Sequence, residues 1–231
     1  YSLTTPGTII IKETLSEQTP IVFSIVTYPA DSGLIEAFDY SGNNLVGTSN
    51  FVPLHNYVDL LASVLPEAKT IAIFHRKGEP NSKIQASNLI RLFKKKNIKV
   101  IDLEPQSINE TVQLAENVIK NIDAFVTTTD TLMQNGAERA LIELSNQYNI
   151  PILSSNKKGI EQGATFGPVA DFYTLGQMSG KMAVQILKGE AAPHTLESKY
   201  QNPPTFLINR SRFNKLGLRF TTQIDGVVYV E

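Results

Sequence analysis

Cysteine is absent from the 231-residue chain, and histidine occurs only three times. The lack of cysteine excludes disulfides, thiol catalysis and cysteine-bound zinc or iron–sulfur sites. The histidines His55, His75 and His194 lie far apart in the sequence, in no spacing typical of a metal centre. We therefore expect no metal ligand among the functional residues and no metal-dependent catalysis.

The chain also lacks an excess of charge and long apolar runs. Its 21 basic and 22 acidic side chains give a formal net charge of −1, whereas nucleic-acid-binding proteins usually carry a strong basic excess. No apolar run reaches the roughly 18–20 residues that a membrane-spanning helix needs. With 42% hydrophobic and 19% charged residues, the composition is that of a globular protein with one or two domains. We expect no nucleic-acid partner.

What the sequence does contain is a repeated alternation of strand-like and helix-like segments. Apolar, β-branched runs of strand length are followed by stretches with helical period. The predicted strands are 20–26, 71–74, 99–103, 124–127, 151–154 and 205–209, with shorter candidates at 2–4 and 45–49. The predicted helices are 54–65, 82–96, 107–121, 131–148 and 173–188. Two of these helices begin with capping-box patterns, Ser82-x-x-Gln85 and Ser107-x-x-Glu110.

This alternation predicts the fold class. Continuous apolar strands separated by helices imply right-handed crossovers and a parallel sheet that is covered on both faces. Residues 70–155 alone provide such a Rossmann-like unit. The strands predicted before residue 70 are too few for a second sheet of the usual size, so we expect the first lobe to be small or incomplete.

Polar side chains gather where the predicted strands end. In an open parallel sheet, ligands bind beyond the carboxyl ends of the strands. The polar residues at these positions include Thr27, Tyr28, His75, Asn81, Ser82, Thr128, Thr129, Asp130, Thr131, Ser155 and Asn156. They contain no recognisable nucleophile–base pair, and no Gly-x-Gly-x-x-Gly, Walker-type or Gly-x-Ser-x-Gly motif accompanies them. Hydroxyls, amides and helix N-termini suit the reversible capture of a small polar or zwitterionic molecule.

Each of these residues also has a structural interpretation. Ser82 and Asp130 can cap the helices that begin beside them. Asp171 can cap the helix that follows it, or it can pair with a ligand ammonium. Tyr28 and Tyr173 can be core or hinge aromatics, or they can stack on a planar ligand.

Several segments, in order, resemble a bacterial ABC-transporter substrate-binding protein family. Residues 20–34 resemble its PIVF-x-x-V-T-D-P-x-x-x-G-L segment, with Tyr28 in place of the aspartate, and residues 42–49 resemble its GGNVTGVS turn and strand. Residues 78–82 resemble its GEANS segment, and residues 163–176 resemble GALASYGVDYYELG. The resemblance covers nearly the whole chain. Within the family, the chain resembles the tryptophan/tyrosine-type and uncharacterised branch of type I solute-binding proteins.

The resemblance implies an α/β, type I periplasmic-binding-protein fold with two Rossmann-like lobes, parallel sheets and a ligand held in the cleft. Lobe I is expected to comprise residues 1–67 and 171–195, and lobe II residues 68–170 and 196–231. The family's first lobe begins with further βα units, so lobe I is expected to be partial.

The resemblance also implies ligand contacts from Thr5 and Thr27, and from Asn81, Ser82, Asp130 and Asp171. Together with the strand-end candidates, the predicted ligand-binding set is Thr5, Thr27, Tyr28, Asn81, Ser82, Asp130, Thr131, Asp171 and Tyr173. No catalytic residue and no cofactor is expected.

The implied function is capture of an amino acid or similar metabolite for an ABC importer by hinge closure, followed by docking on a membrane permease. The implied location is periplasmic or otherwise extracytoplasmic, with a lipid anchor left open. Two alternatives remain at this point. One is the ligand-sensing domain of a transcriptional regulator or receptor kinase with the same fold, and the other is a Rossmann-like enzyme.

Overall fold

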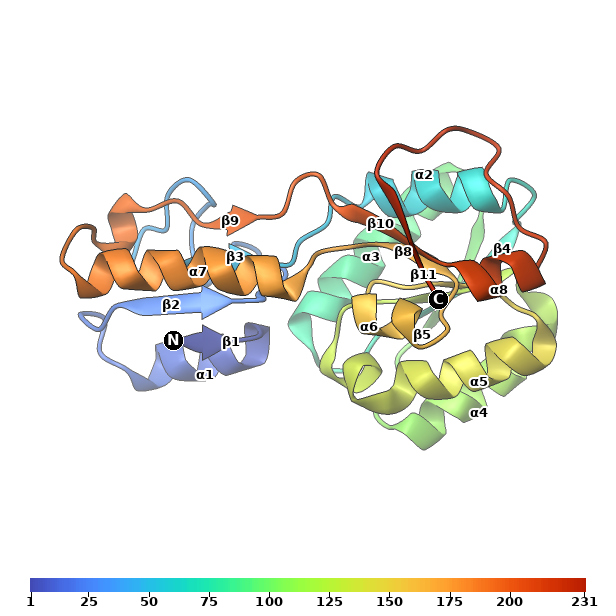
Figure 1. Cartoon of the computed structure of the whole chain (residues 1–231). Helices are drawn as coiled ribbons and strands as arrows, with labels where there is room; N and C mark the ends of the chain where they lie inside the picture. Colours follow the sequence, from blue (N-terminus) through green and yellow to red (C-terminus); the bar gives the residue numbers. More distant parts are fainter. The chain divides into compact units, whose positions relative to one another are not determined.

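The computed structural model describes residues 1–231, and the chain divides into two compact units (Figure 1). Unit 1 comprises residues 1–52 and 170–204, and unit 2 comprises residues 53–169 and 205–231. This division differs from the predicted lobes at two places. Helix α2 (His55–Val64) belongs to unit 2 because it packs on α3 (Pro80–Lys95) and β8 (Phe166–Val169). Strand β9 (Lys199–Tyr200) belongs to unit 1 because it pairs with β3 (Leu45–Ser49).

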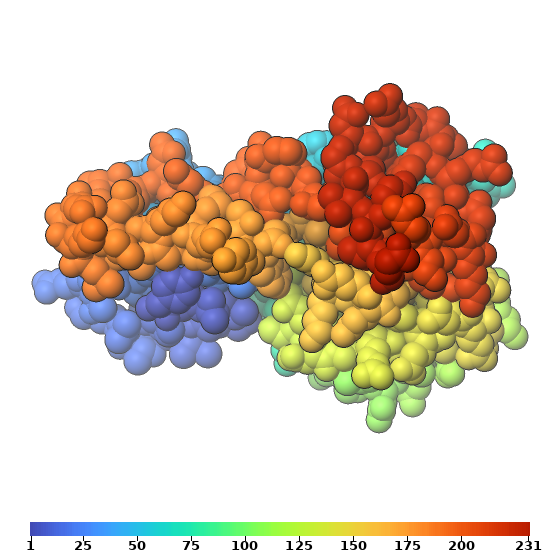
Figure 2. All heavy atoms as spheres, viewed as in Figure 1, coloured from blue at the N-terminus to red at the C-terminus, as the bar shows by residue number.

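Unit 1 is built on a four-stranded sheet in the order β1-β2-β3-β9, and all neighbouring strands are parallel. Its remaining elements are β1 (Ser2–Leu3), β2 (Ile21–Ser24), α1 (Thr5–Thr14), α7 (Phe172–Leu187) and the 3-10 turn η3 (Pro193–Thr195). Alternate side chains of the strands face opposite sides of the sheet. Val22 and Val46 form a cluster with Met182 of α7, and Figure 2 shows the orange atoms of α7 beside the blue N-terminal segment. Phe23 faces the other side, where Ile9 and Ile11 of α1 pack.

Unit 2 contains a seven-stranded sheet in the order β11-β10-β8-β7-β6-β4-β5. The other strands are β4 (Thr70–Phe74), β5 (Lys99–Leu103), β6 (Ala124–Thr127), β7 (Ile152–Leu153), β10 (Thr205–Asn209) and β11 (Val227–Val230). The other helices are α4 (Ile108–Val118), η1 (Ile119–Asn121), η2 (Met133–Ala137), α5 (Glu138–Tyr148), α6 (Lys157–Glu161) and α8 (Arg210–Lys215). Only β8 and β10 pair antiparallel. The carboxyl ends of β4, β6 and β7 therefore meet at one edge of the sheet.

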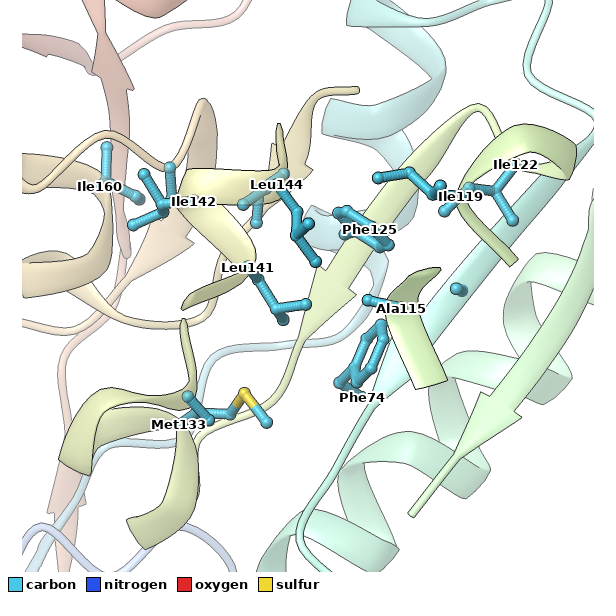
Figure 3. Close-up of a cluster of buried hydrophobic side chains, with 14 of the residues drawn as sticks. Phe74, Ala115, Ile119, Ile122, Phe125, Met133, Leu141, Ile142, Leu144 and Ile160 are labelled. Atoms are coloured by element: carbon cyan, nitrogen blue, oxygen red, sulfur yellow. The ribbon is translucent and has the colours of Figure 1, made fainter. Parts of the chain in front are cut away.

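The main core of unit 2 lies between this sheet and the helices α4 and α5. Phe74 of β4 and Phe125 of β6 are fully buried, and their rings meet edge to face with centroids 5.6 Å apart. Figure 3 shows both rings together with Leu141 and Leu144 of α5. Burial of one such ring contributes about 1.5–3 kcal/mol. This core fixes β4 and β6, whose carboxyl ends carry the predicted polar residues.

One predicted helix start agrees with the structure, one differs, and one predicted helix is interrupted. Ser107 caps α4, because its hydroxyl accepts a hydrogen bond from the Glu110 amide at 3.2 Å, as predicted. The prediction that Ser82 is an N-cap is wrong: α3 begins at Pro80, which favours the first helical position. The predicted helix 131–148 is divided because Gly136 adopts a φ of 122° in η2. No helix of this chain combines the length and the apolar character needed to cross a membrane.

Candidate functional site

Buried polar side chains line the carboxyl ends of the parallel strands in each unit. In unit 2 they lie in three segments, residues 75–82 after β4, 127–131 at the end of β6, and 154–156 after β7. In unit 1 they include Thr5, Ser24, Thr27, Ser49 and Asn50. Because these groups lie out of water, each of their donors and acceptors needs a partner in the protein or in a ligand.

Asp130 joins two of the strand ends in unit 2. Its carboxylate is 1% exposed and accepts hydrogen bonds from the amide of Met133 at 2.8 Å, the hydroxyl of Thr128 at 2.9 Å and the amide of Arg76 at 3.1 Å. Burial raises the pKa of this carboxyl, although its hydrogen bonds act in the opposite direction. Asp130 therefore caps the turn that follows β6 and holds the loop after β4 beside it.

Glu79 is a buried carboxylate of the same loop that the sequence places at a strand end but not in the predicted ligand-binding set. Its oxygens accept hydrogen bonds from the Thr131 amide at 3.2 and 3.3 Å and from the Thr131 hydroxyl at 2.7 Å. The guanidinium of Arg76 pairs with Glu79 at 3.5 Å and also contacts the Thr131 hydroxyl. Thr131 is thus held by protein groups on both its amide and its side chain.

Asn81 and Ser82 have different surroundings, although they are adjacent in α3. The Ser82 hydroxyl donates to the carbonyls of Glu79 and Arg76 at 3.1 and 3.3 Å. The amide nitrogen of Asn81 donates to the carbonyl of Thr129 at 2.7 Å, but its buried Oδ1 has no hydrogen-bond partner. Asn81 therefore presents a free acceptor at the strand ends, whereas Ser82 fixes the start of the helix.

Glu138, on α5, organises the polar groups at the ends of β6 and β7. Its Oε1 accepts hydrogen bonds from the hydroxyls of Thr127 and Ser154, and its Oε2 accepts one from the amide nitrogen of Asn156 at 3.0 Å. The carboxylate fills the space in front of Gly159, where a Cβ would come within 2.2 Å of Oε2. Asn156 keeps a buried Oδ1 without a partner. The carboxylate therefore orients Asn156 so that its second polar atom stays available.

Burial raises the pKa of Glu138 from 4.5 to about 7, and its hydrogen bonds only partly oppose that shift. The folded state then retains a proton that the unfolded chain loses, so the contribution of Glu138 to stability is fully present below pH 4.5 and is lost as the pH rises to about 7. This loss amounts to at most about 3 kcal/mol. Glu138→Gln removes the titration, and we expect its free energy of unfolding to vary less between pH 5 and 8 in urea titrations.

Glu143→Gln, on the exposed side of α5 with 71% of its side chain accessible, is the matched control and should follow the wild-type pH dependence. Identical pH profiles for wild type and Glu138→Gln would contradict the assignment.

Two residues at the strand ends of unit 1 have strained backbones. Thr4 follows β1 with a φ of 65°, and Ile25 follows β2 with a φ of 60°. Both are β-branched, and such residues rarely adopt positive φ. Strain of this kind costs about 1–3 kcal/mol per residue and clusters at binding and catalytic sites. The strain therefore singles out the loop ends that carry the predicted residues Thr5 and Thr27.

Unit 1 also has buried acceptors without partners. Thr5 is the first residue of α1 and is 2% exposed, yet its hydroxyl makes no hydrogen bond. The Oδ1 of Asn50, which follows β3, is likewise buried and unpartnered. Thr27 is buried, and its carbonyl accepts a hydrogen bond from the hydroxyl of Ser49 at 2.8 Å. Asn50 was not predicted, because one asparagine after an uncertain strand gives little signal.

Aromatic rings adjoin these groups in unit 1. The buried ring of Tyr28 meets Phe51 edge to face with centroids 5.7 Å apart. Phe51 meets Tyr200 at 5.5 Å, and Tyr200 meets Phe38 at 5.3 Å. Tyr28 is thus part of a packed aromatic group, and this group offers an apolar surface next to the strand ends.

Asp171 and Tyr173 lie at the start of α7. Asp171 is the N-cap: its Oδ1 accepts from the amide and hydroxyl of Thr174 at 2.9 and 3.2 Å. Its own amide donates to the Oε1 of Gln201 at 2.7 Å. Tyr173 is 75% exposed. The helix-capping interpretation of Asp171 is confirmed, while ligand contact by either residue stays a prediction.

Comparisons with known proteins identify the family of this chain. The sequence pattern of a family described as ABC transporter substrate binding protein matches residues 3–226. This chain belongs to that family. A curated relative, the tyrosine-binding protein of Clostridioides difficile strain R20291, is 28% identical over 172 residues, which are 74% of this chain and 50% of that protein.

Solved structures agree on the fold. An ABC domain from Streptococcus pneumonia in complex with L-Trp has a TM-score of 0.90 at 24% identity, over 99% of this chain and 77% of that one. A ligand-free, open substrate binding protein with adhesive properties from Clostridium difficile has a TM-score of 0.75 at 25% identity, over 99% and 76%. The predicted α/β, type I periplasmic-binding-protein fold is confirmed. The family is one of substrate-binding proteins and not of enzymes. The chain spans about half the length of the curated relatives it matches.

Proposed function

We propose that this chain captures an amino acid with an aromatic side chain as part of the solute-binding component of an ABC importer. The observation that carries the proposal is the set of buried acceptors that lack a partner at the strand ends. These are the hydroxyl of Thr5 and the side-chain carbonyls of Asn50, Asn81 and Asn156. A buried acceptor without a donor costs about 1–3 kcal/mol, so a ligand that supplies donors stabilises these sites.

The chemistry of these acceptors favours a ligand with an ammonium group. An ammonium has three donors and no acceptor. It therefore matches the side-chain carbonyls of Asn81 and Asn156, whose amide nitrogens already donate to protein acceptors. Asp171 provides the negative charge to pair with it, as the resemblance implies. The predicted contacts from Thr27, Tyr28, Thr131 and Tyr173 belong to the same proposal.

The aromatic surface of unit 1 favours a planar apolar side chain on the ligand. Aromatic pairs in offset or edge-to-face geometry gain about 0.5–1.5 kcal/mol beyond burial, and Tyr28 and Phe51 already pack this way. The tyrosine-binding relative and the L-Trp complex are consistent with such a ligand. We infer L-Trp or L-Tyr as the first candidates.

We propose that groups from both units contact the ligand. A ligand that contacts both units favours the state in which both contacts are made, by its differential affinity for that state. We propose that this hinge closure presents the protein to a membrane permease on the extracytoplasmic side. The family to which the chain belongs supports this assignment.

Calorimetric titration of a polypeptide that contains residues 1–231 tests the proposal. L-Trp and L-Tyr should bind saturably, and L-Ala, which lacks the ring, should bind at least roughly tenfold more weakly. 3-Indolepropionate, which keeps the ring and carboxylate but lacks the ammonium, should also lose affinity. D-Ribose serves as the matched negative ligand. Preferential binding of the sugar, or equal affinity for L-Ala and L-Trp, would contradict the proposal.

A further inference from the structure

A histidine and two carboxylates converge at the ends of β4 and β5, on unit 2. The Nε2 of His75 lies 2.9 Å from Oδ1 of Asp102 and 3.4 Å from Oε1 of Glu104. One ligand atom from each of the three residues falls within 4.8 Å of the others. None of these side chains takes part in the proposed amino-acid site, so an ion bound here is independent of that ligand.

The backbone holds the three residues in register. β4 and β5 are parallel neighbours, with Phe74 opposite Leu103, and the amide of His75 donates to the carbonyl of Leu103 at 3.1 Å. Asp102 and Glu104 are two residues apart around the end of β5, so their side chains project from the same face. The three positions therefore come from two rigid strand ends, although 27 residues separate His75 from Asp102 in the sequence.

The burial of the imidazole leaves its hydrogen bonding incomplete. The His75 side chain is 2% exposed, and its Nδ1 is buried with no partner. If Nε2 carries the proton and donates to Asp102, Nδ1 is an unpaired acceptor. If Nδ1 carries the proton, the Nε2 lone pair faces two carboxylates with no donor between them. In the second arrangement a cation between Nε2 and the carboxylates would give the Nε2 lone pair and both carboxylates a partner, while Nδ1–H stays a buried donor without a partner.

The distances fit such a cation. Two ligands about 2.1 Å from one ion are about 3.4 Å apart at the tetrahedral angle and about 3.0 Å apart at a right angle. The measured separations from Nε2 are 3.4 and 2.9 Å. The carboxylates are 46% and 44% exposed, so an ion has a route from solvent and room for water as a further ligand.

We propose that His75, Asp102 and Glu104 bind a divalent transition-metal ion such as Zn²⁺. An imidazole ligand with two carboxylates suits Zn²⁺, Co²⁺ or Ni²⁺ and does not suit Mg²⁺ or Ca²⁺, which prefer oxygen ligands. The ion joins the end of β4 to the end of β5. It thereby fixes the loop that begins at Arg76 and leads to Glu79.

Titration of the untagged, chelator-stripped protein with Zn²⁺ alone tests the site, with Co²⁺ absorption as the spectroscopic readout. We expect one equivalent of Zn²⁺ to bind. His75→Gln, Asp102→Asn and Glu104→Gln should each weaken binding by roughly tenfold or more, and His75→Gln should abolish the Co²⁺ bands. His194→Gln and Glu143→Gln, both at exposed positions, are the matched controls and should bind like wild type.

Three outcomes would overturn the proposal. They are the absence of saturable Zn²⁺ binding by the wild type, unchanged affinity in the folded His75→Gln variant, and Mg²⁺ or Ca²⁺ binding as tight as Zn²⁺. Because His75 is buried, its substitution can impair folding. The substitutions at the half-exposed Asp102 and Glu104 test the site independently of that effect.

Discussion

Asp171→Asn is expected to lose most of the affinity for an amino-acid ligand while α7 stays intact. Asparagine is as good an N-cap as aspartate, so its side-chain oxygen can still accept from the amide of Thr174. What the substitution removes is the negative charge. If that charge pairs with the ligand ammonium out of water, its loss costs about 2–5 kcal/mol, mainly through faster dissociation.

The measurement is calorimetric titration with L-Trp and with 3-indolepropionate, which lacks the ammonium. The affinity should fall for L-Trp and stay nearly unchanged for 3-indolepropionate. The second ligand has no ammonium, so the substitution removes no ion pair from its complex. Asp171→Ala should lose the same affinity and, in addition, about 1 kcal/mol of stability from the missing cap. Equal L-Trp affinity in wild type and Asp171→Asn would remove Asp171 from the site.

The arrangement of strands and helices could be predicted from the sequence because it depends on burial. The run 71–74 is apolar at every position, as a strand covered on both faces must be, and the structure has β4 at Thr70–Phe74. The residues at which helices begin were harder to predict from the sequence. The pattern Ser82-x-x-Gln85 indicates a cap, but Pro80 already favours the first helical position, so the Ser82 hydroxyl instead donates to the carbonyl of Glu79.

The side-chain partners at the site could not be predicted, because they are set by contacts across the sheet. Glu79 and Thr131 are 52 residues apart in the sequence, and their hydrogen bonds arise only once β4 and β6 pair. Glu138 begins a helix and looks like an ordinary first-turn acid, yet its carboxylate is buried among Thr127, Ser154 and Asn156. The sequence predicts where the strand ends gather, and the fold decides which polar atoms remain unpaired.

Helix α2 is a second case in which the sequence predicts an element but not its packing partners. The helix at residues 54–65 was predicted, but the sequence gives no sign of which sheet it covers. The contacts of α2 with α3 and β8 assign it to unit 2. Amphipathic periodicity identifies the face that a helix buries, and it contains no information about the partner.

Gly167→Ala is expected to destabilise unit 2 by roughly 4 kcal/mol or more, among the largest effects of a single methyl group. Gly167 lies within β8, and a Cβ there would come 1.8 Å from the backbone carbonyl oxygen of Ser154. Ser154 cannot retreat freely, because its amide donates to the carbonyl of Phe166 at 2.8 Å. Its hydroxyl also donates to Glu138. Relief of the clash therefore breaks either the β7–β8 pairing or the network around Glu138.

Urea unfolding followed by far-ultraviolet circular dichroism measures this loss, and Gly176→Ala provides the matched control. Gly176 lies inside α7, and nothing lies within 4 Å of the Cβ it would gain. Alanine is favoured over glycine in a helix interior by about 0.8–1 kcal/mol, so the same chemical change should stabilise the protein there. A Gly167→Ala variant that unfolds within about 1 kcal/mol of wild type would show that β7 and β8 separate more easily than their hydrogen bonds suggest. Both glycines gain the same methyl group, so the loss at Gly167 is assigned to its contact with the Ser154 backbone and the gain at Gly176 to helix propensity in open space.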